Sequence, residues 1–190
     1  MKTKSSFCIF LLILKPLFAF ASACDVPKFD NFAPGSFRET RPDMTASELG
    51  MQPIANFRIP TGFLKWGTSP YGGVIFGEHA KGIKGGIMFE TKESVSVHKK
   101  DVSPAEFILS IFKGLDEIGC KYLAGQKLED QEYRLHALYP NGAELFAYGK
   151  LSEHHFYLIR RDKPEYVLHG LLKGINQSEF ESILSTIQFQ

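Results

Sequence analysis

The alternation of apolar and polar residues predicts a β-meander in the C-terminal half of the chain. Its four strands are expected at Gln131–Tyr139, Ala143–Gly149, His154–Arg160 and Tyr166–Lys173. Asn141-Gly142 separates the first two strands, and an Asn-Gly pair is a strong hairpin signal because both residues tolerate the positive φ of a tight turn. We therefore predict that an antiparallel meander forms the centre of the fold.

A glycine-rich stretch before the meander predicts further strands. These are expected at residues 54–59, 63–66, 74–76, 87–89 and 95–97. Pro60-Thr61-Gly62 is a turn signal, so the first two of these strands are expected to form a hairpin. None of the glycines is placed like those of a phosphate-binding loop, because strand-like residues rather than a helix follow them.

Two capping signals predict the helices. Ser103 is a good N-cap, Pro104 suits the first helical position, and Glu106 completes a capping box. An apolar stripe follows, so a helix is predicted at about 103–119. A second Ser-x-x-Glu box predicts another helix at about 178–188.

The order of these elements predicts an α+β fold, in which two main helices cover an antiparallel sheet with a C-terminal meander. Between the first helix and the meander, residues 121–128 are expected to form one more strand. Residues 24–53 have little periodicity and several prolines, which predicts an irregular arm. Residues 54–190 are expected to form a single domain.

Residues 1–23 have the pattern of a secretory signal peptide. Two lysines near the start precede the apolar run Phe7–Leu14, and Ala21-Ser22-Ala23 provides a small-residue cleavage site. A membrane-spanning helix needs about 20 apolar residues, so we do not predict a transmembrane anchor. The protein is expected to be exported, most concretely to a bacterial periplasm.

The charge of the mature chain gives no case for nucleic-acid binding. The full chain has 22 basic and 21 acidic residues. Three of the basic residues (Lys2, Lys4 and Lys15) leave with the signal, so 19 remain against 21 and the net charge becomes −2. A near-neutral surface of this kind lacks the basic footprint that phosphate backbones require.

Two cysteines remain after removal of the signal, Cys24 and Cys120. An even pair in an oxidising compartment predicts a disulfide between them. In the alternative, Ala21-Ser22-Ala23-Cys24 resembles a bacterial lipoprotein processing box, and a lipid on Cys24 would tether the protein to a membrane. We favour the disulfide.

The sequence contains no recognisable catalytic or cofactor motif. It has neither a Gly-x-Ser-x-Gly elbow nor a His-Glu-x-x-His zinc motif, so no catalytic residue, cofactor or metal site is predicted. His136, His155 and His169 fall on neighbouring predicted strands and form a weak histidine patch, the one starting point for metal binding or enzyme chemistry.

Aromatic residues near the glycine-rich stretch are candidates for partner binding. Trp66, Tyr71 and Phe76 are predicted as anchors, because Trp and Tyr on loops often carry the energy of an interface. The alternative interpretation of Trp66 is an ordinary core tryptophan.

The pattern resembles the PsbP-like α/β sandwich family. The resemblance lies in the Ile-Pro-x-Gly-Phe turn (Ile59–Phe63) and in the closing segment Phe180–Phe189, and it covers residues 54–189. It implies an exported accessory, binding or inhibitory protein without enzymatic activity. No functional residue carries over, because no functional motif is shared.

We therefore expect an exported binding protein that has no catalytic activity. Its most concrete form is an immunity or inhibitor protein that binds and neutralises a toxic effector enzyme. One alternative is an envelope accessory protein or lipoprotein that assists a membrane complex. Another is a small-ligand or metal-binding protein, or an enzyme, that uses the histidine patch.

Overall fold

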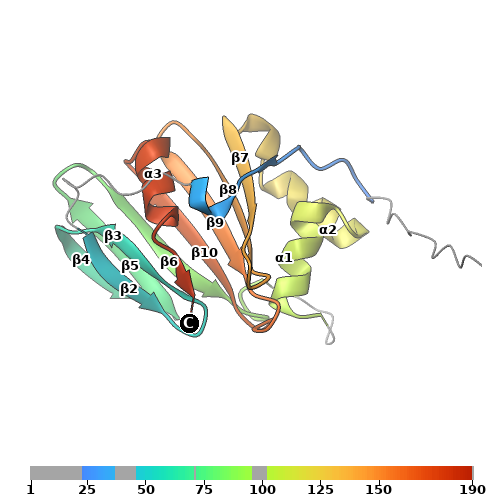
Figure 1. Cartoon of the computed structure of the whole chain (residues 1–190), viewed down its shortest axis with the longest axis horizontal. Helices are drawn as coiled ribbons and strands as arrows, with labels where there is room; N and C mark the ends of the chain where they lie inside the picture. The colour runs from blue at the N-terminus through green and yellow to red at the C-terminus, as the bar shows by residue number, and fades with distance from the viewer. Residues whose placement is uncertain (1–22, 37–45, 71, 96–101, 190) are drawn as a thin grey trace, which may run out of the picture.

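The structure, a computed structural model, describes residues 23–36, 46–70, 72–95 and 102–189. Within these residues the chain forms an α+β fold with three α-helices, a mixed sheet of eight strands and an antiparallel sheet of three strands (Figure 1). The predicted fold class is confirmed. The predicted signal peptide lies outside the described residues, apart from Ala23. None of the described helices is long and apolar enough to cross a membrane.

The large sheet contains the predicted meander. Its strands, in spatial order, are β1 (Asp30–Asn31), β7 (Tyr133–Leu138), β8 (Glu144–Lys150), β9 (Glu153–Ile159), β10 (Val167–Lys173), β6 (Lys84–Glu90), β5 (Gly73–His79) and β4 (Phe63–Thr68). The meander is confirmed as β7 to β10, each antiparallel to its neighbour. β1 runs parallel to β7, so the sheet is mixed and not purely antiparallel as predicted.

The small sheet corrects the prediction for the N-terminal half. It consists of β11 (Gln188–Phe189), β3 (Ala55–Pro60) and β2 (Ala46–Met51), in that order. β3 and β4 do not form the predicted hairpin, because Gly62, with a φ of +92°, turns the chain from one sheet into the other. β2 lies in the segment 24–53 predicted to be irregular, and its order comes from pairing with β3.

The helix predicted at 103–119 is two helices. The first, α1 (Pro104–Lys113), begins as predicted, with the Ser103 hydroxyl accepting from the Glu106 N–H at 3.2 Å and the Glu106 carboxylate accepting from the Ser103 N–H at 2.9 Å. It ends at Gly114, whose φ of 58° places it in the left-handed region that terminates helices.

The second helix, α2 (Glu117–Gly125), corrects the strand predicted at 121–128. The Asp116 side chain caps it by accepting from the Gly119 N–H at 2.7 Å. Gly119 lies directly on α1, since a Cβ there would be 2.5 Å from the Ser110 carbonyl oxygen. This cap and this close contact fix α2, and neither is visible in an apolar pattern.

The C-terminal helix, α3 (Gln177–Leu184), is shorter than the predicted helix 178–188 and begins differently. Asn176, not Ser178, caps it by accepting from the Glu179 N–H at 3.0 Å, while the Glu179 carboxylate accepts from the Asn176 N–H at 2.9 Å. The chain then leaves the helix and forms β11. In the same way, the strand predicted at 95–97 is not seen at its described residue, which lies in a turn.

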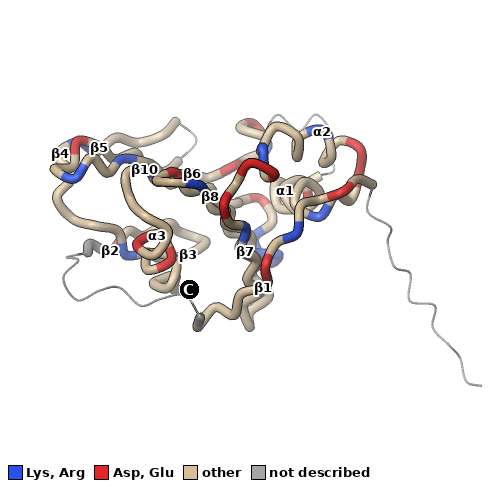
Figure 2. Tube along the Cα trace, turned by 90° about the horizontal axis from the view of Figure 1, so that it is seen from above, with Lys and Arg blue, Asp and Glu red and all other residues tan. Residues whose placement is uncertain are grey.

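Alternation along the strands gives the large sheet two different faces. On one face, α3 and the small sheet form a core with Phe57, Phe156 and Phe180. On the other, α1 and α2 cover the meander, and Phe112 stacks on Phe146 with ring centroids 4.9 Å apart. Figure 2 shows these layers from above, with β4 and β5 far from α1 and α2. No described helix covers that end of the second face.

The predicted disulfide joins Cys24 to Cys120, with Cα atoms 5.9 Å apart. It ties the N-terminal segment to α2, and the Ala23 N–H donates to the Gly114 carbonyl at 2.6 Å beside it. Phe29 then enters the core under α1. The N-terminal part of the segment predicted to be an irregular arm is thus held to the domain by a covalent bond and by apolar packing.

Removing the disulfide is expected to lower the free energy of unfolding of the mature chain by about 2–4 kcal/mol, because the bond constrains a long loop in the unfolded state. Urea denaturation of Cys24→Ser measures the loss. The double variant Cys24→Ser/Cys120→Ser is the control and should match it, because the same bond is missing. A native-like midpoint for Cys24→Ser would contradict the predicted role of this bond.

His154 is fully buried on the core face and is held as a neutral ring. Its Nε2–H donates to the Ile175 carbonyl at 2.8 Å, so its Nδ1 accepts from the Tyr133 hydroxyl, also at 2.8 Å. The Phe180 ring stacks on it with centroids 5.0 Å apart. Burial lowers the pKa of His154, because a charged imidazole would lose its hydration there.

We expect the free energy of unfolding to decrease as the pH falls below about 6.5, the usual pKa of histidine in an unfolded chain. The unfolded state then binds a proton that buried His154 resists, so acid favours unfolding by at most about 1.4 kcal/mol per pH unit for each such histidine. Urea denaturation at pH 7.5 and 5.5 measures this slope. The His154→Gln variant should be less stable at pH 7.5, but its stability should depend less on pH. An unchanged dependence of stability on pH in this variant would contradict the explanation.

Candidate functional site: a groove on the open face of the sheet

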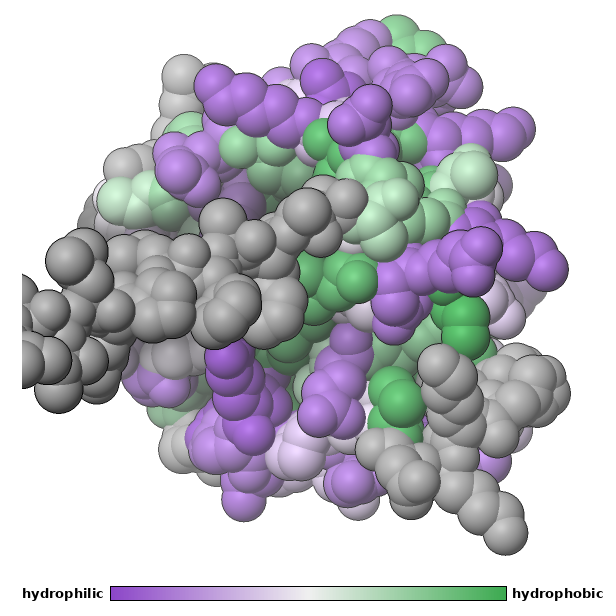
Figure 3. Space-filling view, turned by 90° about the vertical axis from the view of Figure 1, so that its right-hand side faces the viewer, coloured by the Kyte–Doolittle hydropathy of each residue, from purple (hydrophilic) through white to green (hydrophobic). Residues whose placement is uncertain are grey.

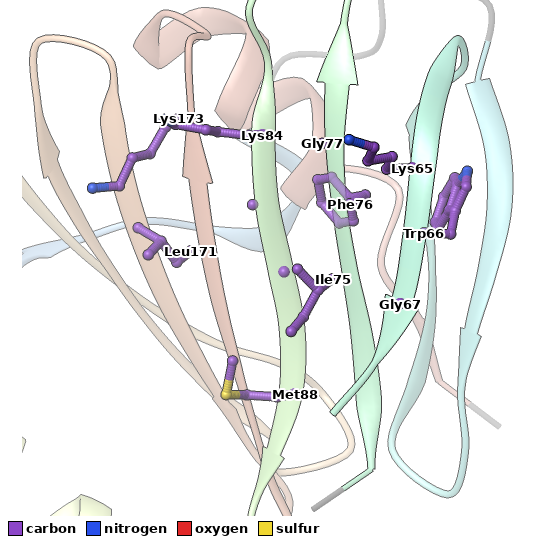
Figure 4. A pocket seen from close by; sticks show the side chains of 12 residues that line it. Lys65, Trp66, Gly67, Ile75, Phe76, Gly77, Lys84, Met88, Leu171 and Lys173 are labelled. Carbon is purple, nitrogen blue, oxygen red and sulfur yellow. The ribbon is translucent and has the colours of Figure 1, made fainter. Parts of the chain in front are cut away.

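The uncovered part of the large sheet carries a groove with a volume of about 560 Å³. Its walls and floor come from β4, β5, β6 and β10 (Figure 4). Ligand pockets in proteins commonly have volumes of ~300–1,000 Å³. The groove is therefore large enough for a small molecule or for several side chains of a partner.

Strand register places the floor residues in one line across the strands. Ile75 on β5 pairs with Gly67 on β4 and with Gly86 on β6, and Gly86 pairs with Leu171 on β10. Residues paired in this way point to the same face of a sheet. Met88 lies two positions further along β6, and Figure 4 shows the three apolar side chains around one hollow.

Two glycines leave space in the groove, although their backbone conformation does not require glycine. Neither Gly67 nor Gly77 has a positive φ, and among the described residues no atom beyond their chain neighbours lies within 4 Å of the place of a Cβ. Gly85 differs, because its Cβ would lie 2.2 Å from the Leu171 carbonyl oxygen. Side chains are therefore missing from the groove at two positions where the fold has room for them.

A row of lysines crosses one end of the groove. Lys84 on β6 pairs with Lys173 on β10, and Lys65 on β4 pairs with Gly77 on β5. In Figure 4 these lysines lie at the end of the groove opposite Met88. The groove therefore has a basic end and an apolar end.

Two carboxylates offset part of this positive charge. Lys65 forms an ion pair with Glu78, and the Lys173 Nζ lies 2.6 Å from a carboxylate oxygen of Glu153. Within the described parts of the chain, no ion pair is found for Lys84. Three lysines against two carboxylates leave one net positive charge at this end of the groove.

β4 is an edge strand with exposed apolar side chains. In the sheet order its neighbour is β5. Leu64 is 79% exposed, Trp66 is 51% exposed, and Ile75 on β5 is 48% exposed. Because Trp66 pairs with the buried Phe76, alternation places Leu64 and Trp66 on the face of the small sheet and Ile75 on the groove face.

The three aromatic residues predicted as anchors have different environments. Trp66 is half exposed on β4 beside the groove, and its ring lies on the face of the small sheet, edge-on to Phe63 at 5.6 Å. Phe76 is 2% exposed and belongs to the core, so its prediction as an anchor is wrong, because alternation on β5 turns its side chain inward. Tyr71 lies outside the described residues.

The histidines of the predicted patch share a face but do not form one site. His155 and His169 are neighbours on β9 and β10, with ring centroids 5.8 Å apart, and they pair with Leu171 and Met88 of the groove. His136 lies on β7, where its Nε2 is 3.2 Å from a carboxylate oxygen of Glu144. Among the described residues, no group of three His, Cys, Asp or Glu side chains is placed to hold a metal ion.

The histidine pair makes a polar boundary between the covered half of the face and the groove. His169 Nδ1 lies 2.8 Å from Glu90, and hydrogen bonds from His169 and Ser94 lower the pKa of Glu90 although burial acts to raise it. Burial, and then the neighbouring His169, lower the pKa of His155. One nitrogen on each ring is buried without a hydrogen-bond partner among the described residues.

The outer surface beside α1 and α2 contrasts with the groove. Figure 3, viewed from that side of the molecule, shows mostly hydrophilic side chains with small hydrophobic areas between them. Scattered exposed apolar residues are normal on a protein surface, whereas a contiguous apolar hollow indicates an interaction site. The groove is therefore the stronger candidate for a functional site.

Sequence reasoning missed the lysine row and most of the apolar floor. Alternation shows which residues of one strand share a face, but it does not show that β6 pairs with β10. The one sequence feature that could have indicated the groove is the set of glycines around Ile75. Glycines in such a stretch are equally well explained by turns and sheet bends.

Comparisons of the chain with protein-family models, curated proteins and solved structures found no match. The resemblance to PsbP-like domains therefore stays a prediction from pattern. The function of the chain has to be inferred from its own residues.

We expect Gly77→Ala to keep or raise stability by up to about 1 kcal/mol, because glycine in a strand interior is entropically costly and the position has room. Gly85→Ala should instead destabilise the fold by several kcal/mol or prevent folding, because its Cβ meets the backbone of β10. Urea denaturation of the two variants measures the difference. Equal effects would contradict the open space at Gly77.

Proposed function

We propose that the protein is an exported binding protein without catalytic activity, which docks a partner protein at the β4 edge. The observation that carries the proposal is the edge strand β4, where Leu64 and Trp66 are exposed on one face, next to β5, where Ile75 is exposed on the other. An edge strand offers N–H and C=O groups to a strand from another chain. The partner is therefore expected to add a strand beside β4.

The exposed side chains supply the affinity for such a partner, and the edge charge supplies selectivity. Tryptophan is enriched among interface residues whose truncation costs about 2 kcal/mol or more. Lys65 on β4 disfavours unselective pairing, as charged residues on edge strands commonly do. A partner strand with an acidic residue opposite Lys65 fits best.

The most concrete form of this function is an immunity or inhibitor protein that neutralises a toxic effector enzyme in the periplasm. The expected signal peptide and the Cys24–Cys120 disulfide suit an oxidising compartment. The disulfide also uses the Cys24 sulfur that a thioether-linked lipid would need. A tethered accessory role is therefore the weaker candidate.

Affinity capture with the tagged mature protein from its native envelope is expected to recover one stoichiometric partner. Its hydrolase activity should be suppressed in the complex and return when the proteins are separated. Leu64→Ser/Trp66→Ala should reduce recovery at least tenfold, because both exposed apolar contacts are lost. Quantified recovery at equal bait concentration is the measurement.

Leu151→Ser is the matched control, because Leu151 lies in the β8–β9 turn and is 79% exposed, as Leu64 is. Loss of recovery with both variants, or with neither, argues against docking at β4. Recovery of a multi-subunit membrane assembly that depends on Leu64 and Trp66 would keep the docking surface but replace the inhibitor role by an accessory role.

A further inference from the structure

We propose that the groove is itself a binding site for a fatty-acid-like amphiphile, a molecule with one alkyl chain and one carboxylate. This site goes beyond the docking of a protein at the β4 edge and does not require that partner. Three features of the groove support it: an elongated apolar floor, a floor backbone that is already hydrogen-bonded, and a basic row at one end.

The floor has the length and shape of a short alkyl chain. From Lys84 to Met88 along β6 it extends about 13 Å, at ~3.3 Å per residue. Ile75 and Leu171 lie on either side of the glycine backbone of β6, in register with Gly86. Of the two β6 glycines beside these side chains, Gly85 is partly exposed and Gly86 is buried, and Figure 4 shows Ile75, Leu171 and Met88 around the hollow.

The central strands of the floor offer a ligand few backbone hydrogen bonds. β6 is paired on both sides over residues 85–88, and β10 is paired on both sides over Val167–Lys173, so their N–H and C=O groups are used within the sheet. A peptide or a sugar laid on this floor would bury polar groups without partners, which is unfavourable. An alkyl chain has no such groups and gains by leaving water.

The basic end of the groove matches a single negative charge. Lys65 and Lys173 are paired with Glu78 and Glu153, which leaves the charge of Lys84 uncompensated among the described residues. A carboxylate at the end of an alkyl chain would lie against Lys84 when the chain points toward Met88. The pairing is exposed to solvent, so it favours the anion over a neutral alcohol by only about twofold to fivefold.

Ligand binding at this site can be measured directly with the isolated protein. Isothermal titration calorimetry of the purified mature protein with decanoate, below the concentration at which decanoate forms micelles, should show saturable binding. Decanol should bind about twofold to fivefold more weakly, and decyltrimethylammonium more weakly still, because it places a cation beside the lysines.

Two pairs of variants locate the ligand. Gly77→Leu fills the groove and should raise the Kd for decanoate more than tenfold, whereas Gly125→Leu, in an equally open position at the end of α2, should leave it unchanged. Lys84→Gln should reduce the affinity for decanoate to that for decanol without altering decanol binding. Lys121→Gln on the exposed side of α2 is the control for lost charge.

Thermal unfolding shows whether Gly77→Leu is folded, and Gly67→Leu replaces it if it is not, because that position is equally open. The proposal is overturned if decanoate shows no saturable binding, if the three ligands bind equally, or if the folded groove-filling variant binds like the native protein. These tests use the isolated protein, so they are independent of whether a partner docks at Leu64 and Trp66.

Discussion

The pairing of β6 with β10 joins the two halves of the chain, and the rest of the structure depends on its register. Seven residue pairs connect the N-terminal strands to the meander. Gly85 permits this close approach, because a Cβ there would lie 2.2 Å from the Leu171 carbonyl oxygen of β10. Gly170 on β10 makes room for the Phe156 ring of β9, which a Cβ would meet at 1.9 Å. The same register that buries the core face also aligns the lysines and the apolar floor on the opposite face.

A buried carboxylate fixes the cover over the other half of that face. Glu144 on β8 is 2% exposed, and it pairs with Lys113 at 2.7 Å and with Arg161 at 2.8 Å. Burial acts to raise the pKa of Glu144, but hydrogen bonds from His136, Lys113 and Arg161 hold it well below its usual range. Because Lys113 is the last residue of α1, this ion pair holds the end of the helix at β8. A helix about 15 Å long that ends there does not also cover β4 and β5.

Elements that depend on neighbouring residues are predicted well from the sequence, whereas features that depend on which distant strands pair are predicted poorly. The meander follows from alternation and Asn141-Gly142, and the start of α1 follows from Ser103 with Glu106. The turn at Gly62 is also visible, but whether the chain returns to the same sheet or enters another depends on which strands are already paired. The groove belongs to this second kind, so Trp66 was identified as a candidate while Lys84 was not.

The groove combines two departures from what stability alone would favour. Gly67 and Gly77 accept a side chain sterically, and alanine in a strand is favoured over glycine by about 0.5–1 kcal/mol. Ile75 exposes apolar surface that a covering helix would bury. Either departure alone is common on protein surfaces. Both occur at one end of one sheet, beside a row of lysines, and departures from local rules concentrate at functional sites. The proposed binding of another molecule at this surface would explain both the missing side chains and the missing cover.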